Sequence, residues 1–321
     1  MNRVLVTGAG GFIGHHLVTR LKDLGYWVRG VDIKYPEFTD VDADEFEILD
    51  LRRWDNCLQA TRGIDHVYAL AADMGGMGFI SGNHATILRN NSLINMHTLE
   101  AARVNGVTRY LYTSSACIYP EHLQLEANVV PLKEEDAYPA DPQDAYGWEK
   151  LLAERACLYY TQEYGLETRI VRFHNIYGPN GTYDGGREKA PAALCRKVAM
   201  VDNGGSIDIW GDGEQTRSFC HIDDCVEGIY RLMKSDHSEP LNLGRDRMVT
   251  INELAKIIID ISGKEGVGLD HIDGPEGVRG RNSDNSRLRE VLGWEPTIPL
   301  EVGLETTYGW IAKMVREQPR A

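Results

Sequence analysis

The sequence predicts an α/β fold in which a doubly wound parallel sheet carries a smaller, partly interleaved C-terminal substrate domain. Three observations lead to this prediction. Short apolar runs alternate with amphipathic stretches through the first half of the chain, which is the pattern of βαβ units and a parallel sheet. A glycine-rich turn joins the first apolar run to the first helical stretch. After Gly178 the alternation loosens into loops punctuated by glycine and proline.

Each element follows from residue type and period. Runs rich in Val, Ile, Leu and Tyr predict strands at Arg3–Thr7, Trp27–Asp32, His66–Ala71, Arg109–Thr113 and Thr168–Phe173. The amphipathic stretches between them predict helices at Ile13–Leu24, Ser92–Asn105 and Ala145–Tyr164. In the second half, helices are expected at Ala190–Met200, Asp223–Lys234, Ile251–Ile261 and Ser286–Leu292.

The domain organisation is expected to be interleaved rather than tethered, because no repeat, low-complexity tract or long polar linker separates the two halves. We expect residues 1–175 to form a dinucleotide-binding domain, with a return segment at about 215–245. Residues 176–214 and 246–321 are expected to form the substrate domain.

The amino-acid composition argues against nucleic acids and anionic membranes as binding partners. The 34 Lys and Arg residues and 48 Asp and Glu residues give the 321-residue chain a net charge of −14, whereas nucleic acids and anionic membranes require a basic face. No apolar run approaches the about 18 residues of a transmembrane helix. Six scattered cysteines without a secretion signal indicate reduced thiols and a cytoplasmic protein. No metal is expected, because no second ligand pair follows Cys220-His221-x3-Cys225.

The glycine-rich turn, Thr7-Gly8-Ala9-Gly10-Gly11-Phe12-Ile13-Gly14, predicts a dinucleotide site of the Rossmann type. Gly8 permits the tight turn, Gly11 lets the backbone approach a pyrophosphate, and Gly14 lets helix and strand pack closely. The N–H groups around Phe12 and Ile13 would face the phosphates at the helix N-terminus. The bland alternative is a structural turn without a ligand.

An acidic residue at the end of the second strand indicates which dinucleotide binds. Asp32 lies 18 residues after Gly14, where a carboxylate accepts hydrogen bonds from the adenosine ribose and repels a 2′-phosphate. NAD is therefore the expected cofactor. Asp50 and Leu51, after the next strand, are expected to flank the adenine.

A candidate catalytic group comes from three residue types at fixed spacing. Tyr146 and Lys150 are four residues apart and share one helix face, so the ammonium is expected to lower the pKa of the phenol. Tyr146 then takes a hydroxyl proton while a hydride leaves the neighbouring carbon. Ser115, at the carboxyl end of a strand, is placed to hold that hydroxyl group.

These motifs resemble those of the extended short-chain dehydrogenase/reductases, the family of nucleotide-sugar epimerases and dehydratases. Within that family, further segments are similar to the GDP-mannose 3,5-epimerases, and the resemblance covers nearly the whole chain. These segments are Ala71-Ala-Asp-Met-Gly-Gly-Met-Gly-Phe-Ile80, Ser114-Ser-Ala-Cys-Ile-Tyr-Pro120, Pro142-Gln-Asp-Ala-Tyr146, Arg172-Phe-His-Asn-Ile-Tyr-Gly-Pro179, Gly185-Gly-Arg-Glu-Lys-Ala-Pro191 and Gly274-Pro-Glu-Gly-Val-Arg-Gly-Arg-Asn-Ser-Asp284.

The resemblance implies an isomerase that uses NAD in a closed cycle on GDP-mannose. Oxidation at C4 acidifies the hydrogens on C3 and C5, and inversion at these carbons gives GDP-L-galactose, with GDP-L-gulose from C5 alone. The family pattern makes Cys117 the base and Lys189 the acid. Taken singly, Cys117 is better explained as a small buried apolar residue and Lys189 as a solvated charge, but their joint occurrence inside these motifs favours the catalytic roles. Sugar dehydratases carry an acidic pair where this chain has Ala116-Cys117, so dehydration is not expected.

The anionic end of a sugar nucleotide needs cations, and basic residues gather in the second half of the chain at Arg187, Lys189, Arg196, Lys197, Arg217, Arg279 and Arg281. By resemblance, the substrate-binding residues are Gly75, Ser115, Cys117, Tyr146, Asn175, Glu188, Lys189, Ala190, Lys197, Gln215, Arg217, Ser218, Arg279 and Arg281. The resemblance also implies a homodimer joined through the helices at Ser92–Asn105 and Ala145–Tyr164.

Two other functions are compatible with the sequence. One is another GDP-hexose epimerase, or an epimerase/reductase similar to GDP-fucose synthase, which shares a Cys followed by Ile-Tyr-Pro but consumes NADPH. Asp32 favours the NAD cycle instead. The other is a non-catalytic NAD-binding sensor, which would be expected to lack Tyr146 or Lys150.

Overall fold

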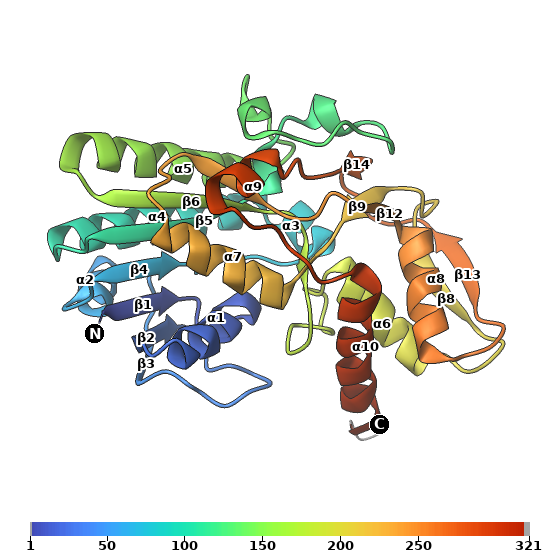
Figure 1. The fold of residues 1–321 in the computed structure, drawn as a ribbon. Coiled ribbons are helices and arrows are strands. Elements are labelled where there is room, and N and C mark those ends of the chain that lie inside the picture. Colours follow the sequence, from blue (N-terminus) through green and yellow to red (C-terminus); the bar gives the residue numbers. More distant parts are fainter. Residues whose placement is uncertain (1, 318–321) are drawn as a thin grey trace.

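The computed structural model describes residues 2–317, and within them a seven-stranded parallel sheet forms one half of the molecule (Figure 1). Its order, β11-β6-β5-β4-β1-β2-β3, runs outward in both directions from β1, so the predicted doubly wound fold is confirmed. The strands are β1 (Arg3–Thr7), β2 (Trp27–Asp32), β3 (Glu45–Ile48), β4 (His66–Ala69), β5 (Arg109–Ser115), β6 (Glu167–Phe173) and β11 (Pro240–Leu243).

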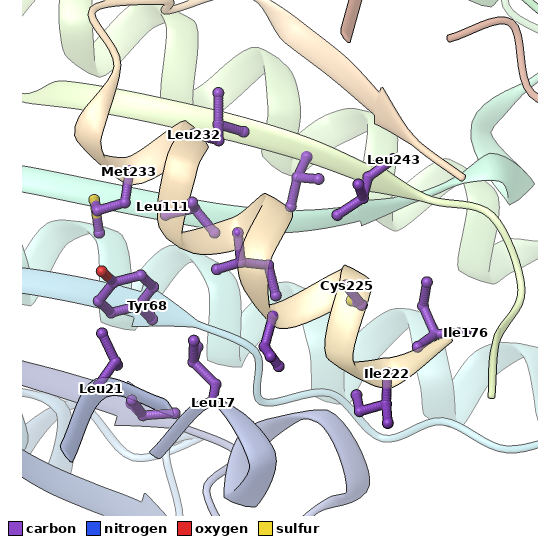
Figure 2. Packing of buried hydrophobic residues seen from close by; sticks show 14 of the residues in the cluster. Leu17, Leu21, Tyr68, Leu111, Ile176, Ile222, Cys225, Leu232, Met233 and Leu243 are labelled. Atoms are coloured by element: carbon purple, nitrogen blue, oxygen red, sulfur yellow. The ribbon is translucent and has the colours of Figure 1, made fainter. Parts of the chain in front are cut away.

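Helices cover both faces of this sheet, because its central strands are apolar on both sides. One face carries α1 (Phe12–Asp23) and α7 (Ile222–Lys234), and the other carries α2 (Trp54–Thr61), α4 (His84–Val104) and α5 (Ala145–Tyr164). Figure 2 shows the first of these cores, in which Leu17 and Leu21 of α1 and Met233 of α7 lie around Tyr68 of β4.

The second half of the molecule holds most of the remaining elements and has its own core between α6, α8 and α10 (Figure 1). Within residues 2–317, no helix combines the length and apolarity needed to cross a bilayer. The other helices and strands are α3 (Met77–Gly82), β7 (Ile176–Tyr177), α6 (Ala190–Met200), β8 (Ser206–Trp210), β9 (Thr216–Ser218), β10 (Cys220–His221), β12 (Met248–Thr250), α8 (Ile251–Ser262), β13 (Gly268–Ile272), β14 (Gly280–Arg281), α9 (Ser286–Leu292) and α10 (Leu300–Glu317), with 3₁₀ turns at Ala116–Ile118, Glu121–Gln124 and Glu134–Ala137.

Several elements differ from the sequence predictions; strand β11 and helices α2 and α3, for example, were not predicted. Three other differences concern α4, β4 and α10. Helix α4 begins at His84, whereas the sequence predicted a start at Ser92. The first half of this helix buries Asn residues that hydrogen-bond to Asp73 and Glu149, so its buried face is not apolar and the sequence pattern did not reveal it. Strand β4 ends at Ala69 rather than Ala71, since the N–H groups of the next two residues bond to the Thr7 hydroxyl instead of a neighbouring strand. Helix α10 was not predicted, although Leu300, Leu304 and Ile311 are buried at helical spacing.

Candidate active site

One large cavity of about 1100 Å³ opens along the carboxyl ends of the central strands and extends between the two halves of the molecule. Its volume is at the upper limit of the roughly 300–1,000 Å³ usual for a single small ligand, so it has room for a cofactor and a substrate. The glycine-rich turn lines one end, α5 and the end of β5 line the middle, and β9 with α6 line the other end.

The glycine-rich turn fits a dinucleotide phosphate. Gly8 has a φ of 71°, and a Cβ atom on Gly14 would stand 2.0 Å from the Gly8 carbonyl oxygen, so only glycine permits this contact of helix and strand. Helix α1 begins after Gly11 with no side-chain cap and no acidic residue in its first turn. Its free N–H groups at Phe12 and Ile13 line the cavity and suit an anion.

The Asp32 carboxylate lies beside this turn and lines the same end of the cavity. It accepts hydrogen bonds from the N–H groups of Gly10 at 2.9 Å and Ile33 at 2.6 Å, which fix its position. Burial raises its pKa above the ordinary value, because the protein removes water without supplying a cation of matching strength. Hydroxyl groups of a ribose would replace the lost water. This end of the cavity therefore suits an adenosine whose 2′-hydroxyl is free.

Tyr146, Lys150 and Ser115 meet in the middle of the cavity, as their spacing predicts. The Ser115 hydroxyl interacts with the Tyr146 phenol, and this interaction acts to lower the pKa of Tyr146. Lys150 is buried, and its Nζ donates to the Thr113 carbonyl oxygen at 2.9 Å and lies 5.5 Å from the centre of the Tyr146 ring. The end of β5 thus holds both partners of Tyr146 in place.

The sequence predicted that Lys150 lowers the pKa of Tyr146. For the protein without a bound cofactor, this prediction is wrong. Burial raises the pKa of Tyr146 well above its ordinary value, and the nearby Cys117 and Glu149 raise it further. Burial also lowers the pKa of Lys150. The physical reason is that desolvation of the phenolate outweighs one ammonium group whose own charge is disfavoured.

Cys117 follows β5 and faces the same space. Its backbone N–H donates to the Ser115 hydroxyl at 3.1 Å, and its thiol accepts a hydrogen bond from the Arg281 guanidinium at 3.2 Å. Helix α5 packs against Cys117 at Gly147. Only glycine permits this contact, because a Cβ atom there would stand 2.2 Å from the Cys117 carbonyl oxygen. The helix that carries Tyr146 is thereby pressed directly against the strand end that carries Cys117.

Lys189 reaches the cavity from the segment that precedes α6. The side chain is exposed, but it is exposed to the cavity, and protein surrounds it. Burial lowers its pKa, and Cys117 acts on the same ammonium in the opposite direction. A lysine of lowered pKa is a stronger acid near neutrality than an ordinary one.

The far end of the cavity presents cations without carboxylate partners. Within residues 2–317, Arg217 donates to the carbonyl oxygens of Thr216 and Val278, and Arg281 to the Gln124 amide and the Cys117 thiol. Burial, together with the neighbouring Arg281 charge, lowers the pKa of Arg217 to about 9. An anion such as a diphosphate would relieve this strain between like charges.

The other predicted site residues can be placed against the cavity. Those that line it are Gly8, Gly11, Phe12, Ile13, Gly14, Asp32, Asp50, Leu51, Gly75, Ser115, Cys117, Tyr146, Lys150, Asn175, Glu188, Lys189, Ala190, Lys197, Gln215, Arg217 and Arg281. Their roles stay predictions.

Two predicted substrate contacts lie outside the lining. In β9, successive side chains point to opposite faces, so Arg217 enters the cavity and Ser218 is buried on the other side. Arg279 is held at the surface by two hydrogen bonds to the Asp212 carboxylate, at 2.7 and 2.8 Å. The structure thus places Ser218 and Arg279 outside the cavity lining, and their roles in binding substrate stay predictions.

The sequence analysis also missed residues of the lining. Asp73 and Met74 follow β4, and Trp210 ends β8 beside Gln215. Asp73 had a signal, because a carboxylate two residues before paired glycines, just after a strand of a parallel sheet, is placed at a binding edge. Trp210 had none, since the order of the small strands is not visible in the sequence. No three His, Cys, Asp or Glu side chains among the described residues are grouped to hold a metal ion.

Comparison with known proteins identifies the family of this chain. The model of the NAD dependent epimerase/dehydratase family matches residues 4–244, about three quarters of the chain. The chain belongs to this family. The match begins in β1 and ends just after β11, so it spans the whole central sheet and the residues Tyr146, Lys150 and Ser115.

Several known enzymes are similar to nearly the full chain. GDP-mannose 3,5-epimerase 1 of Oryza sativa subsp. japonica is 56% identical over 98% of this chain and 83% of its own length. The structure of UDP-glucose 4-epimerase from Thermotoga maritima with UDP-glucose has a TM-score of 0.86 at 28% identity, covering 98% of this chain and 99% of that one. UDP-glucuronic acid 4-epimerase from Bacillus cereus, in complex with UDP-glucuronic acid and NAD, has a TM-score of 0.81 at 26% identity, covering 97% and 99%.

Proposed function

We propose that this protein is an NAD-dependent GDP-mannose 3,5-epimerase, which converts GDP-mannose to GDP-L-galactose, and to GDP-L-gulose when C5 alone inverts. The observation that carries the proposal is the position of Cys117 and Lys189 in the same cavity as Tyr146, Lys150 and Ser115. An oxidoreductase needs only the last three. A thiol and an ammonium beside them supply the two proton-transfer groups that inversion at carbon requires.

The chain's own residues can carry out the proton chemistry. Tyr146 takes the proton of the C4 hydroxyl, and Ser115 holds that hydroxyl in place. NAD held at the glycine-rich turn and Asp32 would supply reversible hydride transfer at C4, so that no reductant would be consumed. While C4 is a ketone, the hydrogens on C3 and C5 are acidic. The Cys117 thiolate removes one such proton, and the Lys189 ammonium delivers another from the opposite face of the ring.

The substrate's nucleotide end is assigned to the second half of the molecule. Arg217 and Arg281 are cations without carboxylate partners and suit the diphosphate, and Lys197 and Gln215 lie farther along the same lining. The Gln215 side-chain oxygen is buried without a hydrogen-bond partner and would accept from the nucleoside.

Dimer formation and location are part of the same proposal. Helices α4 and α5 expose Leu93, Met96, Trp148 and Leu152, which supports their pairing with the same helices of a second copy. All six cysteines are free, which supports a reducing compartment, the cytoplasm.

The test is incubation of the purified protein with GDP-mannose in D₂O, followed by NMR of the sugar. The expected result is deuterium at C3 and C5 together with GDP-L-galactose, without added reductant. Label at C5 alone would indicate a single-site epimerase. The absence of exchange after NAD is supplied would refute the assignment of Cys117 and Lys189 for this substrate.

A further inference from the structure

Arg187 connects two segments that reach the cavity from different halves of the molecule. Its guanidinium donates to the Asp73 carboxylate at 3.2 Å and to the Met74 carbonyl oxygen at 3.3 Å, both in the loop after β4. The same guanidinium stacks 3.8 Å above the centre of the Phe79 ring. Its carbonyl oxygen accepts from the Gly76 N–H at 3.1 Å. Arg187, two positions before Lys189, therefore makes four contacts with the segment that follows β4.

The two segments are pressed together backbone to backbone. A Cβ atom on Gly76 would stand 2.5 Å from the Glu188 carbonyl oxygen, so any side chain there would force the segments apart. The position of Lys189 over the cavity is therefore set by how closely its segment can approach the loop after β4. Arg187 supplies the side-chain part of that attachment.

The loop after β4 is itself held by hydrogen bonds to helix α5, which carries Tyr146. The Asp73 N–H donates to the Asn91 side-chain oxygen at 2.7 Å, and the Asn91 amide donates to the Glu149 carboxylate at 2.9 Å. Glu149 is buried in α5 beside Lys150. A continuous series of hydrogen bonds thus runs from the helix of Tyr146 to the segment of Lys189.

The sequence suggested another role for Arg187, as one of the cations that meet the diphosphate. The contacts favour attachment instead. Arg217 and Arg281 bond to neutral groups, whereas the Arg187 charge already faces the Asp73 carboxylate and its flat surface is occupied by Phe79. The Arg187 charge is therefore already paired with a carboxylate, unlike the charges of Arg217 and Arg281.

We propose that Arg187 is a positioning residue that holds Lys189 opposite Cys117, so that a proton removed by one group is replaced by the other. This inference rests on the proposed function. If the Lys189 segment moves away, the Cys117 thiolate still breaks the carbon–hydrogen bond beside the C4 ketone. The thiol then holds the substrate's proton, which exchanges with D₂O before a deuteron is returned to the same face. The substrate is then labelled at that carbon without inversion.

The experiment compares Arg187→Gln with the wild type in D₂O and measures two rates by NMR, deuterium entry into unreacted GDP-mannose and formation of inverted product. We expect inversion to fall about 10- to 100-fold, the range expected for a misplacement of about 1 Å, with little change in KM. Exchange into GDP-mannose should fall much less, so that the ratio of exchange to inversion rises at least about tenfold. Arg247→Gln is the matched control, because Arg247 is equally exposed and pairs with Glu301.

A second variant removes the same ion pair from the other side. Asp73→Asn should raise the ratio of exchange to inversion in the same direction, and both variants should speed amide hydrogen exchange in residues 185–189, a readout that needs no substrate. An unchanged ratio with a raised KM would make Arg187 a substrate ligand and overturn the proposal, as would unchanged amide exchange. A wild type that labels no substrate would refute the proposed function, while the amide exchange still tests the attachment.

Discussion

The contact of Gly147 with the Cys117 carbonyl oxygen gives the sharpest test of the site geometry. In Gly147→Ala, the new methyl carbon would stand 2.2 Å from that oxygen and 2.7 Å from the Pro142 Cβ atom, whereas ordinary contact begins at 3.4 Å. Helix α5 and the end of β5 must therefore separate by about 1 Å, since neither backbone can rotate away. Tyr146 would then move relative to Ser115 and Cys117.

The magnitude follows from this displacement. We expect kcat for epimerisation to fall about 100-fold with a smaller change in KM, because a misplacement of about 1 Å costs that much in a preorganised site. Overpacking should also lower the free energy of unfolding by about 1–3 kcal/mol. The assays are product formation by NMR at saturating GDP-mannose and urea unfolding.

The control is a second helical glycine. Gly309 of α10 is exposed and has open space where a Cβ atom would stand, so Gly309→Ala should leave kcat unchanged and stabilise the protein by about 0.5–1 kcal/mol. A Gly147→Ala enzyme that folds and keeps a wild-type kcat would refute the argument that this contact sets the positions of the reacting groups.

Three further outcomes are expected. Asp32→Asn should improve NADP binding relative to NAD by about tenfold, because it removes a charge that repels the 2′-phosphate, and fluorescence titration with both cofactors measures this. Arg281→Gln should raise KM for GDP-mannose about 10- to 100-fold, whereas Arg279→Gln, whose partner is Asp212, should change it less than about twofold; equal effects would contradict the placement of the two arginines. Burial lowers the pKa of His15 to about 4, so the unfolded chain binds more protons between about pH 6.5 and 4 and stability is lost as the pH falls through that window. Urea unfolding should show a loss of up to about 2 kcal/mol from His15 between pH 7 and 5, and His15→Gln should reduce that dependence.

Local and periodic features of this protein were accessible from the sequence alone. Apolar runs, the glycine spacing of the first turn and the interval from Tyr146 to Lys150 each depend on neighbours within one turn or one βαβ unit. The doubly wound sheet, the position of Asp32 beside the glycine-rich turn and the meeting of Tyr146 with Ser115 follow from these features, because strand ends in a parallel sheet converge at one edge.

Contacts between distant segments were decided only by the tertiary structure. Which of Arg279 and Arg281 enters the cavity depends on whether Asp212 is within reach, and Ser218 is excluded by the direction of one short strand. The pKa of Tyr146 depends on how much water the packed chain removes, which spacing does not reveal. Arg187 is one more cation in the sequence, and it becomes a connection between two segments only when folding brings Asp73, 114 residues away, to the other end of its side chain. Sequence specifies which groups are present and their local order, and side-chain partners across the fold are determined by packing.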